Sequence, residues 1–394
     1  MPTDTISLAL SPDAARLSST TLAYIERMRV PGAPYGRYLY AEGMAVPVLY
    51  ASSYAAMTRH LYGELDGLGD RQRRAWIGYL QAHQDDDGLF RDPAIYGEGW
   101  YKDDPEWCGR RHLSCHVVTA LTCLGAVAEK PQSWLDLFIA PGGVEGWLEG
   151  RNWRHEPAFA GNEVMNVGTL LQYARDFQGH PAAGDAMHRL LAWLAGHHLD
   201  AAAGVWGYKD LADPLNLSDE VQAAYHFWPL FFYDHVPAPH PERAIDTVLR
   251  TQNPRGGFGW GVHNRHEPWN SSACEDIDSI DPLARLSTLT PHRRDEIRAA
   301  LRRALPWVLS NQNRDGGFVF MRGQPFSYGH PLMASGPDVS AMFPTWFRTL
   351  CLAILAQALP DSPIGAVGWQ FCECPGMQFW RGRSGATPCE RPSH

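Results

Sequence analysis

The stretches QDDDGLF (residues 84–90), QNPRGGF (252–258) and QNRDGGF (312–318) share one pattern: Gln, three residues, Gly, any residue and Phe. Each copy follows an apolar run with helical spacing, such as RRAWIGYLQAH before the first copy and ALPWVLSNQ at the start of the third. A helix end, a polar turn, a Gly with positive φ and an aromatic residue that packs between helices would produce this pattern. We therefore predict a repeat protein built from helices.

The spacing of the copies sets the size of the repeating unit. Phe258 and Phe318 are 60 residues apart, and a looser copy that ends in Trp206 lies 52 residues before Phe258. Phe90 precedes Trp206 by 116 residues, or two such periods. A unit of about 50–60 residues accommodates two helices and their turns. Because the segments between the copies show helical periodicity and no strand-like alternation, the sequence predicts an all-α fold of repeated helical hairpins.

Helical hairpins of this length either stack as an open solenoid or close into an α/α toroid, a barrel of two helical layers. The connections 91–111, 259–275 and 321–342 are long and irregular, which favours a closed toroid with its loops gathered at one end. We expect a helical segment at 1–70 that packs on the toroid, the toroid itself at 71–360 and a C-terminal tail at 361–394.

Composition narrows the expected partners and location. The 394 residues carry a net charge of −9 and no basic run, so nucleic acid is not an expected partner. No stretch reaches the roughly 18 uncharged apolar residues of a membrane span, and the N-terminus lacks the pattern of a signal peptide. The eight Cys are scattered, as in reduced proteins of the cytoplasm, where we expect this protein. The 15 Trp indicate a large core or an aromatic-lined cavity.

A second stretch, SSACEDIDSIDPLARL at residues 271–286, concentrates acids where a helix is expected to start. Four carboxylates fall within seven residues: Glu275, Asp276, Asp278 and Asp281. One acid is enough to cap a helix, because a single carboxylate can meet the helix dipole and the free N–H groups. The surplus of acids beside a loop rich in Trp and His therefore indicates a functional site rather than capping alone.

Both stretches resemble motifs of one superfamily. The repeats resemble the QW motifs of squalene–hopene cyclases, and the resemblance spans roughly residues 70–355. The sequence DIDSID is similar to the Asp-x-Asp-Asp motif of class II terpene cyclases, typically Asp-Ile-Asp-Asp-Thr-Ala, and here too a helix and a further repeat (WVLSNQNRDGGF, 307–318) follow it. The chain thus resembles the superfamily of terpenoid cyclases and protein prenyltransferases, whose members are α/α barrels with the substrate inside.

The resemblance implies a reaction and roles for the acids. In class II terpene cyclases the middle Asp of the motif is the Brønsted acid, which corresponds to Asp278, and the first Asp corresponds to Asp276. The third position is Ser279, a departure from the family, and Asp281 lies close enough on a helix to take its place. The implied enzyme is a class II-type terpene cyclase, an isomerase or lyase that starts the cyclisation of a linear isoprenoid by protonation. Its acid step needs no metal, and Mg²⁺ would accompany only a diphosphate substrate.

The chemistry of that reaction sets requirements for the site. Protonation of an alkene or epoxide needs a neutral carboxylic acid, which burial and neighbouring anions provide near neutral pH. The carbocation that follows needs π faces and the exclusion of water. We expect Asp278 to donate the proton, with Asp276 and Asp281 tuning it. We expect the substrate to contact Trp260, Trp269, His263, His266, Asn270, Trp107, Tyr328, Phe343 and Trp346.

Two groups of Cys and His have the spacing of metal ligands. The stretch WCGRRHLSCH (107–116) places His112 and His116 four residues apart, close to Cys108. The tail FCECPG (371–376) holds Cys372 and Cys374. Zinc is an alternative at either place, but neither group completes a ligand set, so we predict no metal.

Two other functions stay open at this point. An (α/α)6 toroid with paired acids, His, Tyr and many Trp also suits a carbohydrate-active enzyme, either a glycoside hydrolase or a polysaccharide lyase. A non-catalytic binding toroid would keep the repeats without a competent acid, and Ser279 is the residue that favours it. For the cyclase we expect a small isoprenoid as partner, with peripheral contact to a membrane as an option, and the sequence does not define the oligomeric state.

Overall fold

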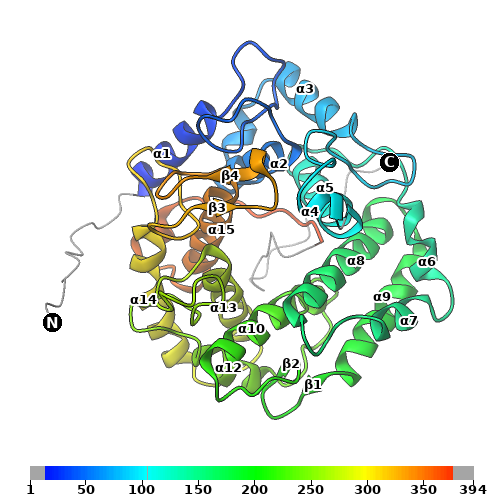
Figure 1. Ribbon diagram of the computed structural model, residues 1–394, viewed down its shortest axis with the longest axis vertical. Coiled ribbons are helices and arrows are strands. Elements are labelled where there is room, and N and C mark those ends of the chain that lie inside the picture. The colour runs from blue at the N-terminus through cyan, green and yellow to red at the C-terminus, as the bar shows by residue number, and fades with distance from the viewer. Residues whose placement is uncertain (1–13, 104, 376–394) are drawn as a thin grey trace, which may run out of the picture.

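Two concentric layers of helices surround one axis in the computed structural model (Figure 1), which we describe for residues 14–375 except residue 104 and the side chains of residues 14 and 105–108. The inner layer consists of α2 (Leu49–Leu61), α5 (Leu113–Cys123), α8 (Pro157–Phe177), α10 (Pro214–Tyr225), α13 (Ala273–Leu286) and α15 (Met342–Ala358). Each inner helix contacts the next, and α15 contacts α2, which closes the ring. The predicted α/α toroid is therefore confirmed.

The outer layer supplies a partner for each inner helix. It consists of α1 (Ala14–Arg27), α3 (Asp70–Gln81), α6 (Asp136–Ile139), α7 (Gly143–Glu149), α9 (Pro181–Gly196), α12 (Pro241–Leu249) and α14 (Arg294–Ser310). The first hairpin, α1 and α2, contributes its second helix to the inner ring between α15 and α5. As a statement about independently folding units, the division of the chain at residues 70 and 360 stays a prediction.

Short elements complete the connections. The helices α4 (Trp100–Asp103) and α11 (Trp228–Tyr233) and a π-helix, η2 (Pro105–His112), join the longer helices, together with the 3-10 turns η1 (Glu64–Gly67), η3 (Ser133–Leu135), η4 (Pro331–Met333) and η5 (Pro363–Ala366). Two antiparallel strand pairs lie in the loops, β1 (Leu199–Asp200) with β2 (Val205–Trp206) and β3 (Phe326–Ser327) with β4 (Ala334–Ser335). Each strand is only two residues long, so the helices alone define the architecture.

The three tight repeats adopt one local structure. The Gln side chain donates from Nε2 to the carbonyl of the Gly four residues later, at 2.8 Å for Gln84, 2.9 Å for Gln252 and 3.0 Å for Gln312. These glycines have φ values of 94°, 96° and 91°, a left-handed conformation that favours glycine. A Cβ would also lie only 2.2, 2.6 or 2.1 Å from a backbone oxygen of a neighbouring segment. Both conditions explain why each repeat carries Gly at this position.

The Phe that ends each repeat connects it to the next inner helix. All three rings are fully buried. The backbone N–H of Phe90 donates to Ser114 Oγ at 2.8 Å, and that of Phe318 donates to Thr345 Oγ1 at 2.9 Å. In the middle repeat, the N–H of Phe258 donates to Asp276 Oδ1 at 2.9 Å. The repeat framework therefore fixes the position of one of the acids at the start of α13.

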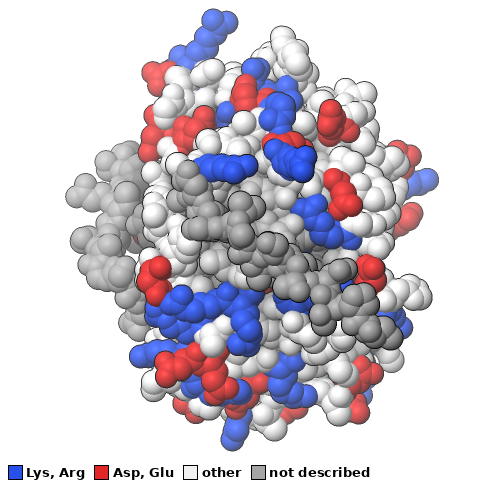
Figure 2. Space-filling view, turned by 90° about the vertical axis from the view of Figure 1, so that its left-hand side faces the viewer, with Lys and Arg blue, Asp and Glu red and all other residues white. Residues whose placement is uncertain are grey.

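The surface, the hydropathy of the helices and the end of the described chain each show one further feature. On the face that includes α1 and α14, basic and acidic side chains lie next to one another (Figure 2), as in the ion pairs of Arg298 and Arg302 with Asp361. No helix among the described residues is long and apolar enough to cross a membrane. After η5 the chain passes the end of α2, where the N–H of Gln370 donates to the carbonyl of Leu61 at 2.9 Å.

Candidate functional site

The N-terminus of α13 is built as a capping box. Ser272 Oγ accepts from the backbone N–H of Glu275 at 3.1 Å, and Glu275 Oε2 accepts from the N–H of Ser272 at 3.0 Å. The other oxygen of Glu275 accepts from the N–H groups of Gly261 and Val262, which holds the preceding loop. Capping therefore accounts for one of the four acids, and the other three need a different explanation.

Asp276 is the hub of a buried hydrogen-bond network. Its Oδ1 accepts from Phe258 N–H and from Ser271 Oγ, both at 2.9 Å, and its Oδ2 accepts from Trp307 Nε1 and Arg348 Nη1, also at 2.9 Å. Burial raises the pKa of Asp276, and the charge of Arg348 and the hydrogen bonds oppose this rise. Four donors surround the carboxylate, so the group acts as an acceptor that ties α13 to α14, α15 and the repeat.

Asp278 has the opposite environment. The residue is 3% exposed, and its carboxyl group has no hydrogen-bond donor among the described residues. Burial raises the pKa of Asp278 well above its ordinary value, and the charges of Glu275, Asp281 and Asp276 raise it further. Because nothing here favours the carboxylate, the surroundings of Asp278 favour its neutral form over its charged form. Cys274, one turn earlier on the same helical face, is half-buried, so this face is more open than that of Asp276.

Asp281 lies one turn after Asp278 and is compensated by a cation. Its Oδ1 accepts from Arg285 Nε at 2.6 Å, and both side chains are almost fully buried. Burial raises the pKa of Asp281, and the charge of Arg285 lowers it. The charges of Asp281 and Asp278 in turn raise the pKa of Tyr225 on α10, after burial as the largest cause, so the Tyr hydroxyl lies close to both acids. This side of Asp278 therefore contains one paired anion and one neutral phenol.

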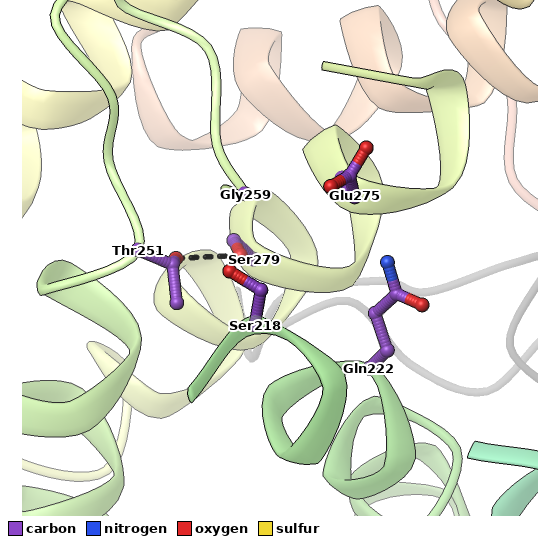
Figure 3. A pocket seen from close by; sticks show the side chains of 6 residues that line it. All are labelled: Ser218, Gln222, Thr251, Gly259, Glu275 and Ser279. Atoms are coloured by element: carbon purple, nitrogen blue, oxygen red, sulfur yellow. Dashed lines mark hydrogen bonds between the residues drawn. The ribbon is translucent and has the colours of Figure 1, made fainter. Parts of the chain in front are cut away.

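Ser279, the residue that departs from the cyclase motif, does not share the surroundings of Asp278. Its Oγ lies 3.0 Å from Thr251 Oγ1, directly before the repeat that begins at Gln252 (Figure 3). Ser218, Gln222, Gly259 and Glu275 complete the walls of this small polar pocket, which leaves no room for a molecule the size of water. Neighbouring residues on a helix do not face each other, so Ser279 packs against α10 and the repeat while Asp278 points elsewhere.

An aromatic cluster lies next to the start of α13. It consists of the rings of Tyr54, Phe320, Phe326, Tyr328, Phe343 and Trp346. Phe343 is at its centre, with ring centroids 5.8 Å from Phe326, 4.8 Å from Tyr328 and 6.1 Å from Trp346. Phe320 lies 4.0 Å from Phe326, and Tyr54 lies 4.9 Å from Trp346. The N–H of Ala273 donates to the carbonyl of Phe320 at 3.0 Å, which joins the cluster to the first residue of α13. Three predicted substrate contacts, Tyr328, Phe343 and Trp346, therefore come together.

A histidine and two tyrosines border this cluster. His112 Nδ1 lies 2.8 Å from the hydroxyl of Tyr50, and His112 Nε2 lies 3.2 Å from that of Tyr328. Burial lowers the pKa of His112 well below its ordinary value, and His116 and His226 lower it further, so the ring is neutral. His116 Nδ1 is bonded to the carbonyl of His112. Since both nitrogens of His112 are engaged, the pair His112 and His116 is not arranged as zinc ligands.

The other predicted contacts lie away from the aromatic cluster. His263 bonds through Nδ1 to Ser272 Oγ at 2.9 Å, beside the cap of α13, and its ring is 5.3 Å from that of Phe320. Trp269, 45% exposed, and His266 line a separate surface hollow of about 280 Å³ together with Asn270, Arg255, Glu267 and Pro268. Trp260 is half-buried and donates to the carbonyl of Arg250 at 3.2 Å. The side chain of Trp107 lies outside the described residues.

Sequence reasoning missed two tyrosines of the inner helix α2 and a histidine that directly follows α10. Tyr50 and Tyr54 contribute rings from α2, where their spacing of four residues in LYASSYAAM puts both on one helical face. His226, at the end of α10, bonds to Asn162 of α8 at 3.3 Å, and burial lowers its pKa to about 4. The tyrosine spacing could have been read from the sequence, whereas the meeting of α8 and α10 depends on closure of the ring.

Comparison with known proteins places the fold. No model of a protein family and no curated protein sequence matches the chain. A variant of the type II terpene cyclase MstE from Scytonema, in complex with geranylgeranyl dihydroxybenzoate, is 14% identical with a TM-score of 0.49 and covers 89% of this chain and 97% of that chain. A polysaccharide lyase is 11% identical with a TM-score of 0.50 and covers 89% and 99%. A glycosidase in complex with glucose is 14% identical with a TM-score of 0.48 and covers 92% and 99%.

Sequence identities of 11–14% are evidence about the fold alone. The polysaccharide lyase, at a TM-score of 0.50, shares the architecture over nearly its whole length. All three compared proteins are enzymes, but their names describe three different chemistries. A common fold does not imply a common reaction, because reactions depend on the residues of the site. The chain thus shares its α/α toroid with the polysaccharide lyase, and its reaction depends on the residues around α13.

Proposed function

We propose that this protein is a class II-type terpene cyclase in which Asp278 protonates a linear isoprenoid. The observation that carries the proposal is the contrast within α13. Asp278 is buried beside three further acids and has no donor within the described part of the chain, whereas Asp276 is bound by four donors. A neutral carboxylic acid at neutral pH is the reagent that protonation of an alkene or epoxide requires. Asp278 has the environment that produces it.

The neighbouring acids have supporting roles in this proposal. Asp276 has no oxygen left for a proton, since each of its oxygens accepts from two donors. Asp281 is bound to Arg285, and its remaining negative field raises the pKa of Asp278. Asp276 therefore positions α13 and Asp281 tunes the acid. The Ser at position 279 does not remove the acid, because Asp281 supplies a neighbouring anion.

The chemical steps follow from the site. Asp278 transfers its proton to a carbon of the terminal alkene or to the epoxide oxygen. The electron pair of the broken O–H bond stays on the carboxylate of Asp278. A tertiary carbocation forms, an internal alkene attacks it to make the ring bond, and loss of a proton or addition of water ends the sequence. The aromatic cluster beside α13 would stabilise the cation by its π faces. The acid step uses no metal, and Mg²⁺ stays an expectation for a diphosphate substrate only.

Arg348 is not available to bind a diphosphate. Its guanidinium is 1% exposed and is engaged by Asp276 Oδ2 and by the carbonyls of Val319 and Phe320. A buried cation with these partners is part of the framework. The residues next to Asp278 therefore favour contact with the hydrocarbon end of an isoprenoid, where protonation begins.

Incubation with a panel of linear prenyl diphosphates, prenyl alcohols and their epoxides tests the proposal, with mass spectrometry to detect cyclised products. Wild type is compared with Asp278→Asn, and with Asp295→Asn as a control on the exposed part of α14. We expect product from wild type and from the control but not from Asp278→Asn. Full activity of Asp278→Asn would refute the role of Asp278, and absence of turnover with every prenyl substrate would refute the cyclase.

One observation favours a second candidate, a carbohydrate-active enzyme. The neutral His112 lies between the hydroxyls of Tyr50 and Tyr328, an arrangement able to pass a proton between a base and an acid, as elimination across a uronic acid requires. Anionic polysaccharides therefore form a separate arm of the same assay, read by the absorbance of the unsaturated product. Turnover of polysaccharide that is lost in Tyr328→Phe and kept in Asp278→Asn would establish this function instead.

A further inference from the structure

We propose a zinc site at the opposite end of the inner helices, formed by His60, Cys123 and Cys372. His60 lies in the last turn of α2, Cys123 is the last residue of α5, and Cys372 belongs to the chain that follows η5. One ligand atom from each residue lies within 4.8 Å of the other two. Three segments that are far apart in the sequence therefore bring an imidazole and two thiols to one point.

The distance between the two sulfur atoms fits tetrahedral coordination of one ion. The two sulfur atoms, Cys123 Sγ and Cys372 Sγ, are 3.7 Å apart. In a tetrahedral zinc site with Zn–S bonds of about 2.3 Å, two sulfur ligands are about 3.8 Å apart. The spacing of the thiols is thus that of two ligands on one metal ion, while a disulfide would require them to approach to about 2.05 Å.

The ligands suit zinc among the divalent metals. Thiolate and imidazole are the ligands zinc prefers, and two Cys and one His with water in the fourth position form a known coordination set. Binding would displace one proton from each thiol to solvent, so that two thiolates and a neutral imidazole hold the ion. Cys123 is 6% exposed and the other two residues are half-buried, which leaves one side accessible for the ion and its water.

The chain around Cys372 is already held against the two helices. The N–H of Gln370 donates to the carbonyl of Leu61, and the ring of Trp369 lies 5.0 Å from that of Tyr62. Beyond Cys372, the Sγ of Cys374 lies 3.5 Å from Thr122 Oγ1, on α5. A zinc ion at the centre of these contacts would fix the segment that follows the toroid to both α2 and α5.

The site is separate from the proposed acid. Tyr50, which borders the aromatic cluster, and His60 are ten residues apart on α2, or about 15 Å along the helix axis. Cys123 follows His116 by seven residues on α5, which is about 10 Å. The zinc site therefore does not depend on the cyclase proposal, and its function is to clamp the chain rather than to react.

Metal analysis of the full-length protein, purified without chelator and then dialysed against zinc, tests the proposal. We expect close to one zinc ion per chain, falling to near zero in Cys123→Ser combined with Cys372→Ser. Cys351→Ser changes a buried cysteine of α15 in the same way and serves as the matched control, which should keep its zinc. Circular dichroism shows whether each variant is folded.

Substitution by Co²⁺ gives a readout that requires no variant. Cobalt in a tetrahedral site with two thiolates has intense visible and sulfur-to-metal absorption bands, and each single Cys variant should weaken the sulfur-to-metal band about twofold, one thiolate of the two being lost. Wild-type protein that binds neither zinc nor cobalt, or that keeps its zinc in the double variant, would overturn the proposal. So would thiol titration that finds Cys123 and Cys372 joined in a disulfide in the protein as purified.

Discussion

Asp276 and Asp278 stand two residues apart on one helix, are both buried, and have opposite surroundings. Asp276 receives four hydrogen bonds, one of them within the ion pair with Arg348, while Asp278 has no donor among the described residues and three acids close by. Burial is therefore common to both and cannot separate their functions. The donors separate the two residues: hydrogen bonds and the charge of Arg348 favour the carboxylate of Asp276, and no such bond favours that of Asp278 among the described residues. Our proposal assigns the acid to Asp278 on this difference.

The largest expected effect is on catalysis at Asp278. Asp278→Asn should lower kcat/KM for the cyclised substrate by about 10³-fold or more, because the amide has no proton to donate. The melting temperature should stay the same or rise, since a neutral amide replaces a carboxyl group whose ionisation the fold disfavours. Steady-state kinetics and thermal unfolding of the same samples check both parts. A loss of stability without a loss of activity would show that Asp278 has a structural function and is not the acid.

The next effect is on stability at Asp276. Asp276→Asn leaves Arg348 buried without its anion, and removal of one partner of a buried ion pair costs about 3–5 kcal/mol. Urea unfolding measures the change in the free energy of unfolding. In a background of Arg348→Met the same substitution should cost much less, because no charge is then left unpaired. Equal costs in both backgrounds would show that the ion pair is not what holds Asp276.

The pH dependence of kcat/KM in an Asp281 variant tests whether Asp281 raises the pKa of Asp278. The proposed acid is active only while Asp278 is protonated, so kcat/KM should fall as the pH rises through the raised pKa of Asp278. Asp281→Asn removes an anion that raises the pKa of Asp278, so this pKa should fall. The alkaline limb of the profile should therefore move to lower pH, with a severalfold loss at neutral pH that is recovered at lower pH. An unchanged profile would exclude Asp281 from tuning the acid.

Glu220 on α10 is intermediate between Asp276 and Asp278, because it is buried but accepts hydrogen bonds from the backbone. We expect a smaller effect on stability here. Burial raises the pKa of Glu220 to about 7, although the N–H of Lys209 donates to it. The folded protein therefore binds more protons than the unfolded chain between about pH 4.5 and about pH 7, and stability should decrease as the pH rises through this window. Glu220→Gln should flatten this decrease. Melting temperatures of both proteins across the window measure the difference, and parallel curves would contradict the assignment.

Much of the fold could be predicted because its signals are local. The glycines of the three repeats adopt the positive φ that the pattern predicts, and the aromatic residues Phe90, Phe258 and Phe318 are buried between helices as expected. Ser272 and Glu275 form a capping box, which also depends only on residues three positions apart. Each of these features depends on a few consecutive residues, so the sequence contains the necessary information.

The environment of the acids could not be predicted from local sequence. The sequence shows Asp276 and Asp278 as equivalent members of one motif, and what separates them comes from Trp307 and Arg348, which lie 31 and 72 residues away. His60, Cys123 and Cys372 likewise meet only because α2 and α5 are neighbours at one end of the ring. Contacts between residues so far apart in the sequence form only when the toroid closes, so a short sequence pattern does not predict them.

The contact between α15 and α2 has a consequence for the order in which the molecule is made. The two helices are neighbours in the ring although 280 residues lie between Leu61, the end of α2, and Met342, the start of α15. During synthesis the partner of α2 on this side is the last inner helix to leave the ribosome. Until then Tyr54 of α2 lacks its contacts with Trp346 and Phe343. Chaperones would therefore encounter an open, aromatic-rich arc, and release of the chain would coincide with the docking of α15.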